Sequence, residues 1–202
     1  MIKNMVFDMG NVLVSFDMPK YCERFADDPK DQRLLLEELF YSIEWAQTDR
    51  GTISIEDAID RISARLPEHL KGKVGPMFYG WQQDSPHIPG MEKLIQRLKA
   101  AGYKIYLLSN TATLYYSFRH KLPAIDLFDG EFASADYKLL KPDQQIYHTF
   151  LRKFDLKAEE CFFVDDMVAN IEAAISVGFD GFVFKGDANA LEETLVKKGL
   201  TF

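Results

Sequence analysis

The sequence has little cysteine and no long hydrophobic run. It contains only two cysteines, Cys22 and Cys161, which lie far apart and form no CxxC or Cys/His cluster of metal-ligand spacing. We therefore expect both to be reduced packing residues. No apolar run approaches the length of a membrane span, and the N-terminal MIKNMVFD lacks the apolar region of a signal peptide. These absences predict a cytoplasmic protein with no membrane partner.

Positive charge is also scarce. Lys and Arg number 24 against 31 Asp and Glu, which gives a formal net charge of -7 with no block of like charges. This balance argues against a general electrostatic attraction to nucleic acid, so the expected partners are small or neutral molecules. The length of 202 residues and the 47% hydrophobic composition allow one core domain with a modest insertion. The oligomeric state, monomer or homodimer, stays open.

The second half of the chain alternates short apolar strands with amphipathic helices, which is typical of an α/β fold with a parallel sheet. Glycine and proline mark several of the boundaries between these elements. Strands are predicted at residues 2–7, 103–108, 130–134, 161–164 and 181–184, and helical faces at 91–98, 146–154, 171–175 and 191–195. The strands at 103–108, 161–164 and 181–184 are continuous apolar or aromatic runs, so we expect both faces of the sheet to be covered.

Residues 17–85 have helical patterns throughout and predict a helical insertion after the first strand. One stripe contains Leu36, Leu39, Phe40 and Ile43, and a second helix begins after Ser54, a predicted N-cap. The predicted division is therefore a core of residues 1–16 and 86–202 and an insertion of residues 17–85. Its candidate hinges lie near Phe16 to Pro19 and near Asp84 to Pro89.

Polar residues lie at the ends of the predicted strands or in the loops that follow them. They are Asp8, Ser109, Asn110, Lys141, Asp165 and Asp166. Ligands of an open parallel sheet bind beyond the carboxyl ends of its strands, so we expect these side chains to converge. Carboxylates suit Mg²⁺, while a hydroxyl, an amide and a lysine suit phosphate oxygens. The pattern predicts phosphoryl transfer.

Four segments, FDMGNVLV, LLSN, LLKPDQQIY and FFVDDMVANIEAA, resemble in order the four motifs of the haloacid dehalogenase superfamily of aspartate-nucleophile phosphohydrolases. Any one alone would be weak, but the resemblance covers nearly the whole chain. It implies a Rossmann-like three-layer core with a mostly parallel sheet and a small α-helical cap that closes over the site. The DMGN variant and the helical layout also resemble a bacterial subgroup typified by α-glucose-1-phosphatase.

The resemblance also implies a role for each site residue. Asp8 would attack phosphorus, and Mg²⁺ would be held by Asp8, the Gly10 carbonyl and Asp166, with Asp165 in support. Lys141 would keep Asp8 ionised and bind phosphate beside Ser109 and Asn110, while Asn11 and Asn170 would support the acids. Lys138 is the alternative to Lys141, and the Lys-Pro pair favours Lys141.

The sequence departs from the family pattern at Gly10, where the phosphatases usually carry a second aspartate that serves as general acid and base. Loss of such an acid costs about 10²- to 10⁴-fold in rate. A sugar phosphate such as glucose 1-phosphate expels an acidic hemiacetal oxygen and needs less protonation. We therefore favour a Mg²⁺-dependent phosphomonoesterase acting on a small phosphorylated metabolite of this kind. What replaces the missing acid is open.

Two other functions compete with this one. A 2-haloacid dehalogenase uses the same aspartate without a metal, and the acidic pair Asp165 and Asp166 argues against it. A catalytically impaired binding protein would have no evident use for Asp8 and Lys141 together. A phosphomutase is a minor option. The aromatic residues Trp45, Tyr79 and Trp81 are interpreted as core packing, with Trp81 as the one that can reach the cleft.

Overall fold

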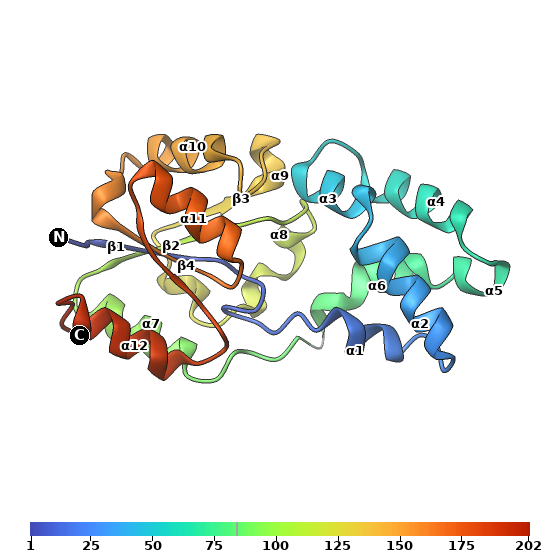
Figure 1. Cartoon of the computed structure of the whole chain (residues 1–202), viewed down its shortest axis with the longest axis horizontal. Coiled ribbons are helices and arrows are strands. Elements are labelled where there is room, and N and C mark those ends of the chain that lie inside the picture. The colour runs from blue at the N-terminus through green and yellow to red at the C-terminus, as the bar shows by residue number, and fades with distance from the viewer. Residues whose placement is uncertain (84) are drawn as a thin grey trace.

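The fold is built on one five-stranded parallel sheet (Figure 1). The structure is a computed structural model and describes residues 1–83 and 85–202. The strands are β1 (Asn4–Phe7), β2 (Lys104–Ser109), β3 (Gly130–Ala133), β4 (Cys161–Asp165) and β5 (Asp180–Val183), in the spatial order β3-β2-β1-β4-β5. Every predicted strand is present with its ends within two residues. The predicted parallel sheet is therefore confirmed.

Helices cover both faces of this sheet. On one face lie α7 (Met91–Ala100) and α12 (Ala188–Lys197), and on the other α10 (Gln144–Phe154) and α11 (Val168–Val177) (Figure 1). Shorter helices connect the elements: α8 (Tyr115–Phe118), α9 (Ser134–Tyr137), and the 3₁₀ turns η3 (Arg119–Lys121), η4 (Ile125–Leu127) and η5 (Ala158–Glu160). The predicted three-layer α/β core is confirmed.

Side chains of β1 show why the middle of the strand is apolar. Met5 and Phe7 pack with α7 and α12, whereas Val6 between them packs with α10 and α11. Successive side chains of a strand point to opposite faces, so the middle of a strand covered on both sides favours apolar residues. Polar residues stand at its two ends: Asn4, whose amide donates to Glu160 O at 3.4 Å, and Asp8.

The segment that follows β1 is helical, as predicted. It contains α1 (Met18–Glu23), α2 (Pro29–Leu35), the π-helix η1 (Leu36–Phe40), α3 (Ile43–Arg50), α4 (Ile55–Arg65), α5 (Glu68–Lys71), α6 (Val74–Gly80) and the 3₁₀ turn η2 (Trp81–Gln83). We call residues 18–83 the helical unit. It has a hydrophobic cluster of its own and lies at one end of the sheet, opposite both chain termini (Figure 1). Among the described elements, each helix is too short or too polar to span a bilayer.

Two chain segments connect the helical unit to the sheet. They run beside each other, because Ser15 N donates to Pro86 O at 2.8 Å and Ile88 N donates to Leu13 O at 2.9 Å. One predicted hinge begins at Asp84, which lies outside the described residues. The exact domain boundaries at residues 16/17 and 85/86 stay predictions.

Two details of the predicted helical faces are wrong. Ile43 does not share the buried stripe of Leu39 and Phe40, because the chain turns at Tyr41 and a new helix begins after its N-cap Ser42; Ile43 is 67% exposed. Ile175 lies beside the buried stripe of α11 and is 52% exposed. The predicted N-cap Ser54 is confirmed, since its hydroxyl accepts from Asp57 N at 2.9 Å.

One ion pair ties α3 to α4 inside the helical unit. Arg65 donates from both terminal nitrogens to the two oxygens of the buried Glu44, at 2.8 and 2.9 Å, and from Nε to Glu38 at 2.6 Å. The hydrogen bond from Arg65 holds the pKa of Glu44 below its usual value. The Glu44 carboxylate would lose its main partner if Arg65 were removed.

We expect Arg65→Met to lower the free energy of unfolding by about 1–2 kcal/mol at pH 7, a value reduced for the 40% exposure of the arginine side chain. A carboxyl whose folded pKa is depressed stabilises above its unfolded pKa, so the difference should shrink as the pH falls below about 4. Urea melts at pH 7 and pH 4 measure it. Arg33→Met, which removes only an exposed pair with Glu37, is the control; equal midpoints for the two variants would contradict the assignment.

Candidate active site

Asp8 lies immediately after β1, at the carboxyl edge of the sheet. Its backbone N–H donates to Val164 O at 2.9 Å, which continues the pairing with β4 and fixes where the side chain starts. The carboxylate is largely buried, and its Oδ1 lies 2.9 Å from Lys141 Nζ. This contact is an ion pair without the alignment of a hydrogen bond, so Oδ1 has no hydrogen-bond partner among the described residues. The Ser109 hydroxyl also interacts with the carboxylate.

Lys141 is the buried cation of the site. Its Nζ donates to Asp165 Oδ2 at 2.6 Å and to Leu108 O at 3.0 Å, and only 1% of its side chain is exposed. Asn110 holds its backbone on both sides, donating to Lys141 O at 3.0 Å and accepting from Lys141 N at 2.8 Å. The alternative lysine, Lys138, is exposed at the end of α9. The structure thus brings Lys141 to Asp8.

The two acids at the end of β4, Asp165 and Asp166, have different surroundings. Asp165 is fully buried and accepts hydrogen bonds from Lys141, from Met167 N at 2.8 Å, and from Asn170 Nδ2 at 2.9 and 3.0 Å. Asp166 is half-buried and accepts from the side chain of Asn11 at 3.0 Å. Asp165 is therefore committed to holding Lys141 and the start of α11, whereas Asp166 keeps free acceptor capacity.

Asn11 connects the loop after β1 to Asp166. Its side-chain oxygen accepts from Phe16 N at 2.9 Å while its amide nitrogen holds Asp166. Its φ of 54° lies in the left-handed region, which asparagine adopts more readily than most residues apart from glycine. In this conformation the two ends of the Asn11 side chain bind Phe16 N and Asp166 at the same time.

The three carboxylates fit a divalent cation. Asp8, Asp165 and Asp166 each offer an oxygen, and these oxygens lie within 4.8 Å of one another. Burial raises the pKa of Asp8 to about 6, although Lys141 opposes the shift, and burial also raises the pKa of Asp166. Asp8 and Asp166 keep oxygens with free acceptor capacity, and oxygens of this kind are the ligands that Mg²⁺ takes, usually from one or two carboxylates plus water and phosphate.

A cavity of about 200 Å³ opens in front of Asp8, and we call it the carboxylate cavity. The sheet side contributes Asp8, Gly10, Asn11, Ser109, Asn110 and Asp166, while Lys141, Asp165 and Asn170 lie buried behind them. The helical unit contributes Trp45, Asp49 and Trp81. Trp81 thus reaches the cavity, whereas Tyr79 contacts Glu56 instead. Trp45 and Asp49 were not predicted to lie here.

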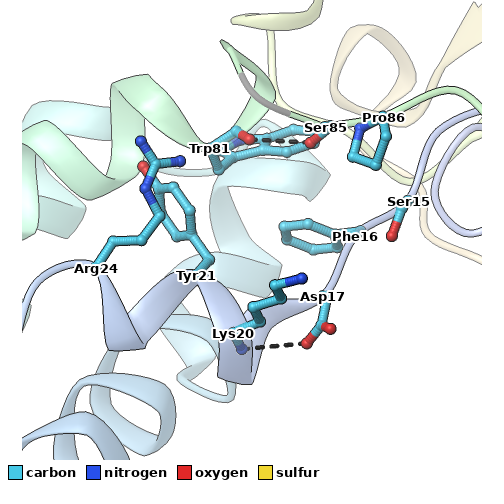
Figure 2. A pocket seen from close by; sticks show the side chains of 9 residues that line it. All are labelled: Ser15, Phe16, Asp17, Lys20, Tyr21, Arg24, Trp81, Ser85 and Pro86. Atoms are coloured by element: carbon cyan, nitrogen blue, oxygen red, sulfur yellow. Dashed lines mark hydrogen bonds between the residues drawn. The ribbon is translucent and has the colours of Figure 1, made fainter.

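A second cavity, of about 340 Å³, lies where the helical unit joins the sheet (Figure 2). Figure 2 shows Phe16 and Trp81 next to each other, with Lys20 and Arg24 projecting from α1 and its end. The Phe16 and Trp81 rings lie 4.7 Å apart and line both cavities, so they form the wall between the two. None of the predicted site residues lines this second cavity.

Comparisons with known proteins agree with this architecture. A family model for haloacid dehalogenase-like hydrolases matches residues 2–178. A sesquiterpene phosphatase of Aspergillus oryzae is 30% identical over 89% of this chain and 88% of its own length. A D-ribitol-5-phosphate phosphatase of Bacteroides thetaiotaomicron is 23% identical over 97% of this chain and 98% of its own.

Similarity to solved structures extends to the fold. A haloacid dehalogenase family enzyme of Bacteroides thetaiotaomicron, solved in complex with magnesium and inorganic phosphate, superposes with a TM-score of 0.73 at 21% identity, covering 95% of this chain and 99% of that one. The parallel sheet, the acidic residues at its carboxyl edge and the family match lead to one conclusion: the chain belongs to the haloacid dehalogenase-like hydrolases.

Proposed function

We propose that the protein is a Mg²⁺-dependent phosphomonoesterase of small phosphorylated metabolites. One observation carries the proposal: a carboxylate, Asp8, paired with the buried Lys141, faces a cavity whose edge holds a second acid, Asp166. The names of two relatives, a sesquiterpene phosphatase and a D-ribitol-5-phosphate phosphatase, support the same class of reaction. Magnesium and phosphate bound by a structural neighbour support the cofactor.

Asp8 is the nucleophile in this proposal. Its carboxylate oxygen attacks phosphorus, the ester bond to the leaving oxygen breaks, and an aspartyl-phosphate forms that water later hydrolyses to inorganic phosphate. Lys141 keeps Asp8 in the ionised form that attacks, because its buried ammonium opposes the effect of burial. Ser109 lies beside Asp8, where its hydroxyl can donate to a phosphate oxygen.

The cofactor is Mg²⁺, which Asp8 and Asp166 would hold together with the Gly10 carbonyl, while Asp165 supports from behind. A divalent cation here neutralises charge on the phosphate oxygens and on the clustered carboxylates. Asn110, Asn11 and Asn170 act as supports in this proposal, since their side chains hold Lys141, Asp166 and Asp165 respectively. Binding of phosphate by Asn110 stays a prediction.

The helical unit acts as a cap over the site. It contributes Trp45, Asp49 and Trp81 to the wall of the cavity that Asp8 also lines, so it can contact the part of a substrate beyond the phosphate. A wall of this kind excludes bulk water during transfer of the phosphoryl group to Asp8 and selects the leaving group. A sugar phosphate such as glucose 1-phosphate is the first substrate to test, because its leaving oxygen needs little protonation.

Dehalogenation of a 2-haloacid is the competing activity. The same Asp8 would displace halide from carbon, and the relatedness of the fold does not separate the two reactions. The clustered acids Asp165 and Asp166 favour the phosphatase, since a dehalogenase has no need of a metal. Halide release from 2-haloacids without metal tests this alternative directly.

The first experiment measures phosphate release from p-nitrophenyl phosphate and glucose 1-phosphate with and without Mg²⁺. We expect release to require the metal. Asp166→Asn should raise the Mg²⁺ concentration for half-maximal rate at least about 10-fold, because a ligand oxygen loses its charge. The increase in Tm that Mg²⁺ gives to the wild type should fall in parallel. Asp126→Asn, which changes an exposed acid, is the control. If phosphate release by the wild type and both variants does not depend on Mg²⁺, the metal site is refuted.

A further inference from the structure

We propose that Asp49 is the general acid and base of the reaction and replaces the aspartate that the chain lacks at Gly10. The inference rests on the proposed phosphatase function and adds the group that protonates the leaving oxygen. It follows from where α3 places the Asp49 side chain. Sequence patterns point to no such group, because Asp49 belongs to the helical unit and not to the motifs at the edge of the sheet.

The Asp49 carboxyl faces the carboxylate cavity. It interacts with the backbone N–H of Ala112 and with the side chain of Trp45, and both of these residues line the same cavity. Its charge also interacts with that of Asp8, which lines the same cavity. The carboxyl therefore shares the cavity with the nucleophile and lies near enough for the two charges to interact, so it can reach the leaving oxygen of a substrate bound there.

The other acids of the cavity already have roles. Among the described residues that line it, three have titratable side chains: Asp8, Asp49 and Asp166. Asp8 is the nucleophile, and Asp166 is a metal ligand held by Asn11. Lys141 is buried behind Asp8 and bound to Asp165, so it has no path to the leaving oxygen. Asp49 is the remaining group that can give and take a proton.

Contacts with the core hold Asp49 in place. The fully buried Ser134 donates from its hydroxyl to Asp49 O at 2.5 Å, and the same hydroxyl accepts from Thr111 N at 2.8 Å. Gly51, with φ of 72°, lets the end of α3 approach α9 so closely that an added Cβ would lie 2.3 Å from Ala135 O. Asp49 is thereby fixed relative to the loop that follows Ser109, as a catalytic group requires.

The protonation state of Asp49 suits both halves of the reaction. Burial raises its pKa to about 7, and the negative charge of Asp8 adds to the shift while Ala112 N–H and Trp45 oppose it. The contacts from α9 come from Ser134 and Ala135, which are uncharged. A carboxyl in this range is present in both forms near neutral pH, the condition under which acid and base catalysis are most effective.

The two steps balance around this one proton. In the first, the bond from Asp8 to phosphorus forms, the bond from phosphorus to the substrate oxygen breaks, and Asp49 gives its proton to that oxygen to release an alcohol. In the second, ionised Asp49 takes a proton from water as the water oxygen attacks phosphorus and the bond to Asp8 breaks. Inorganic phosphate leaves and Asp49 is protonated again.

This role widens the substrate range of the proposed phosphatase. With an acid in place, the leaving oxygen need not be the acidic hemiacetal oxygen of glucose 1-phosphate, and ordinary alkyl phosphates become substrates. The dependence of rate on the leaving group is therefore the property to measure. A merely structural Asp49 would change all substrates alike.

The test compares Asp49→Asn with the wild type on p-nitrophenyl phosphate, phenyl phosphate and phenethyl phosphate. We expect kcat/KM for the alkyl ester, phenethyl phosphate, to fall about 10²- to 10⁴-fold, with a change of less than about 10-fold for the nitrophenyl ester, whose leaving group needs no proton. With the nitrophenyl ester, the variant should release one equivalent of nitrophenolate per enzyme quickly and then turn over slowly, because hydrolysis of the aspartyl-phosphate lacks its base.

Two variants complete the design. Asp49→Glu keeps the acid and should recover part of the activity on phenethyl phosphate, while Asp60→Asn, an exposed acid of the same helical unit, should leave all three rates unchanged. An equal loss on all esters without a burst, or no loss on any, would overturn the role of Asp49. Failure of the wild type to release phosphate in an Asp8-dependent way would instead overturn the phosphatase proposal itself.

Discussion

Asp8→Asn is expected to lower kcat for phosphate release by at least about 10⁴-fold, the scale on which enzymes lose rate when their nucleophile is removed. The amide has nearly the same shape as the carboxylate but cannot form the aspartyl-phosphate. In the variant Lys141 keeps its other partner, Asp165, which lies 2.6 Å away, so the buried ammonium is not left unpaired. The loss should therefore come from chemistry and not from unfolding.

Stability should move in the opposite direction. Burial raises the pKa of Asp8 to about 6, above its value in an unfolded chain. A carboxyl shifted in this way binds its proton more tightly when folded, so its ionisation costs stability as the pH rises through the interval between the two pKa values. Without metal at pH 8, Asp8→Asn should unfold at the same Tm as the wild type or higher.

Phosphate release and metal-free thermal melts test both parts of this prediction. Asp126→Asn, an exposed acid, should change neither property. A variant that keeps its rate within 10-fold of the wild type would exclude Asp8 as nucleophile. A variant that is inactive and also melts much lower would mean that Asp8 holds the fold together, which the raised pKa contradicts.

The sheet could be predicted from sequence because its strands are short apolar runs that need to be buried on both faces. Between their first and last residues CFFVD and KIYLLS are continuously apolar, which is the pattern expected of strands covered on both faces. The helical unit was harder. The apolar residues from Leu36 to Ile43 have helical spacing throughout. The π-helix nevertheless ends at Phe40, and a separate helix begins at Ile43 after its N-cap Ser42, which the spacing alone does not reveal.

The site also has a part that the sequence predicts, at the edge of the sheet, and a part that it does not, in the helical unit. Asp8 and Asp166 directly follow strands, and Ser109 ends one. Lys141 lies just beyond the short helix that follows β3, so the topology of a parallel sheet brings all four residues to one edge. Asp49 could not be found by this reasoning, because its place depends on how α3 packs against α9 through Ser134. The sequence shows only that it lies one helical turn after Trp45. Residues contributed by the helical unit become visible only when the two parts are seen together.

The motif resemblance implied that Asn11 and Asn170 support the acids, as their hydrogen bonds do, but it did not reveal the partners of Asn110 and Asp165. Asn110 was predicted to contact phosphate, but its amide is hydrogen-bonded to the backbone of Lys141 at 2.8 and 3.0 Å. Asp165 was predicted to support the metal, and its oxygens accept from Lys141, Met167 and Asn170. Both residues fix the position of the lysine or of the helix that follows. Both residues bind Lys141, so the position of this lysine beside Asp8 depends on them.

Lys141→Met is therefore expected to damage both activity and stability. The ammonium is 1% exposed and lies 2.9 Å from Asp8 and 2.6 Å from Asp165, so its removal leaves two buried carboxylates facing each other. Breaking a buried ion pair from one side costs about 3–5 kcal/mol. The rate should fall at least about 10²-fold, since Asp8 would lose the charge that keeps it ionised for attack.

The pH dependence distinguishes lost charge from lost packing. Burial lowers the pKa of Lys141, but Asp165 and Asp8 outweigh it and the net shift is upward, so the lysine is charged throughout the working range. In the variant Lys141 no longer opposes the effect of burial, so the pKa of Asp8 rises further above its unfolded value and a proton can take the place of the ammonium. The stability of the variant then increases as the pH falls, so its loss in free energy of unfolding relative to the wild type should be larger at pH 8 than at pH 5.5.

Urea melts at the two pH values measure this loss, with Lys138→Met, a substitution of the exposed lysine nearby, as the matched control. A deficit that is the same at both pH values would show that Lys141 contributes only the packing of its side chain, and the ion-pair basis of the site would then be wrong.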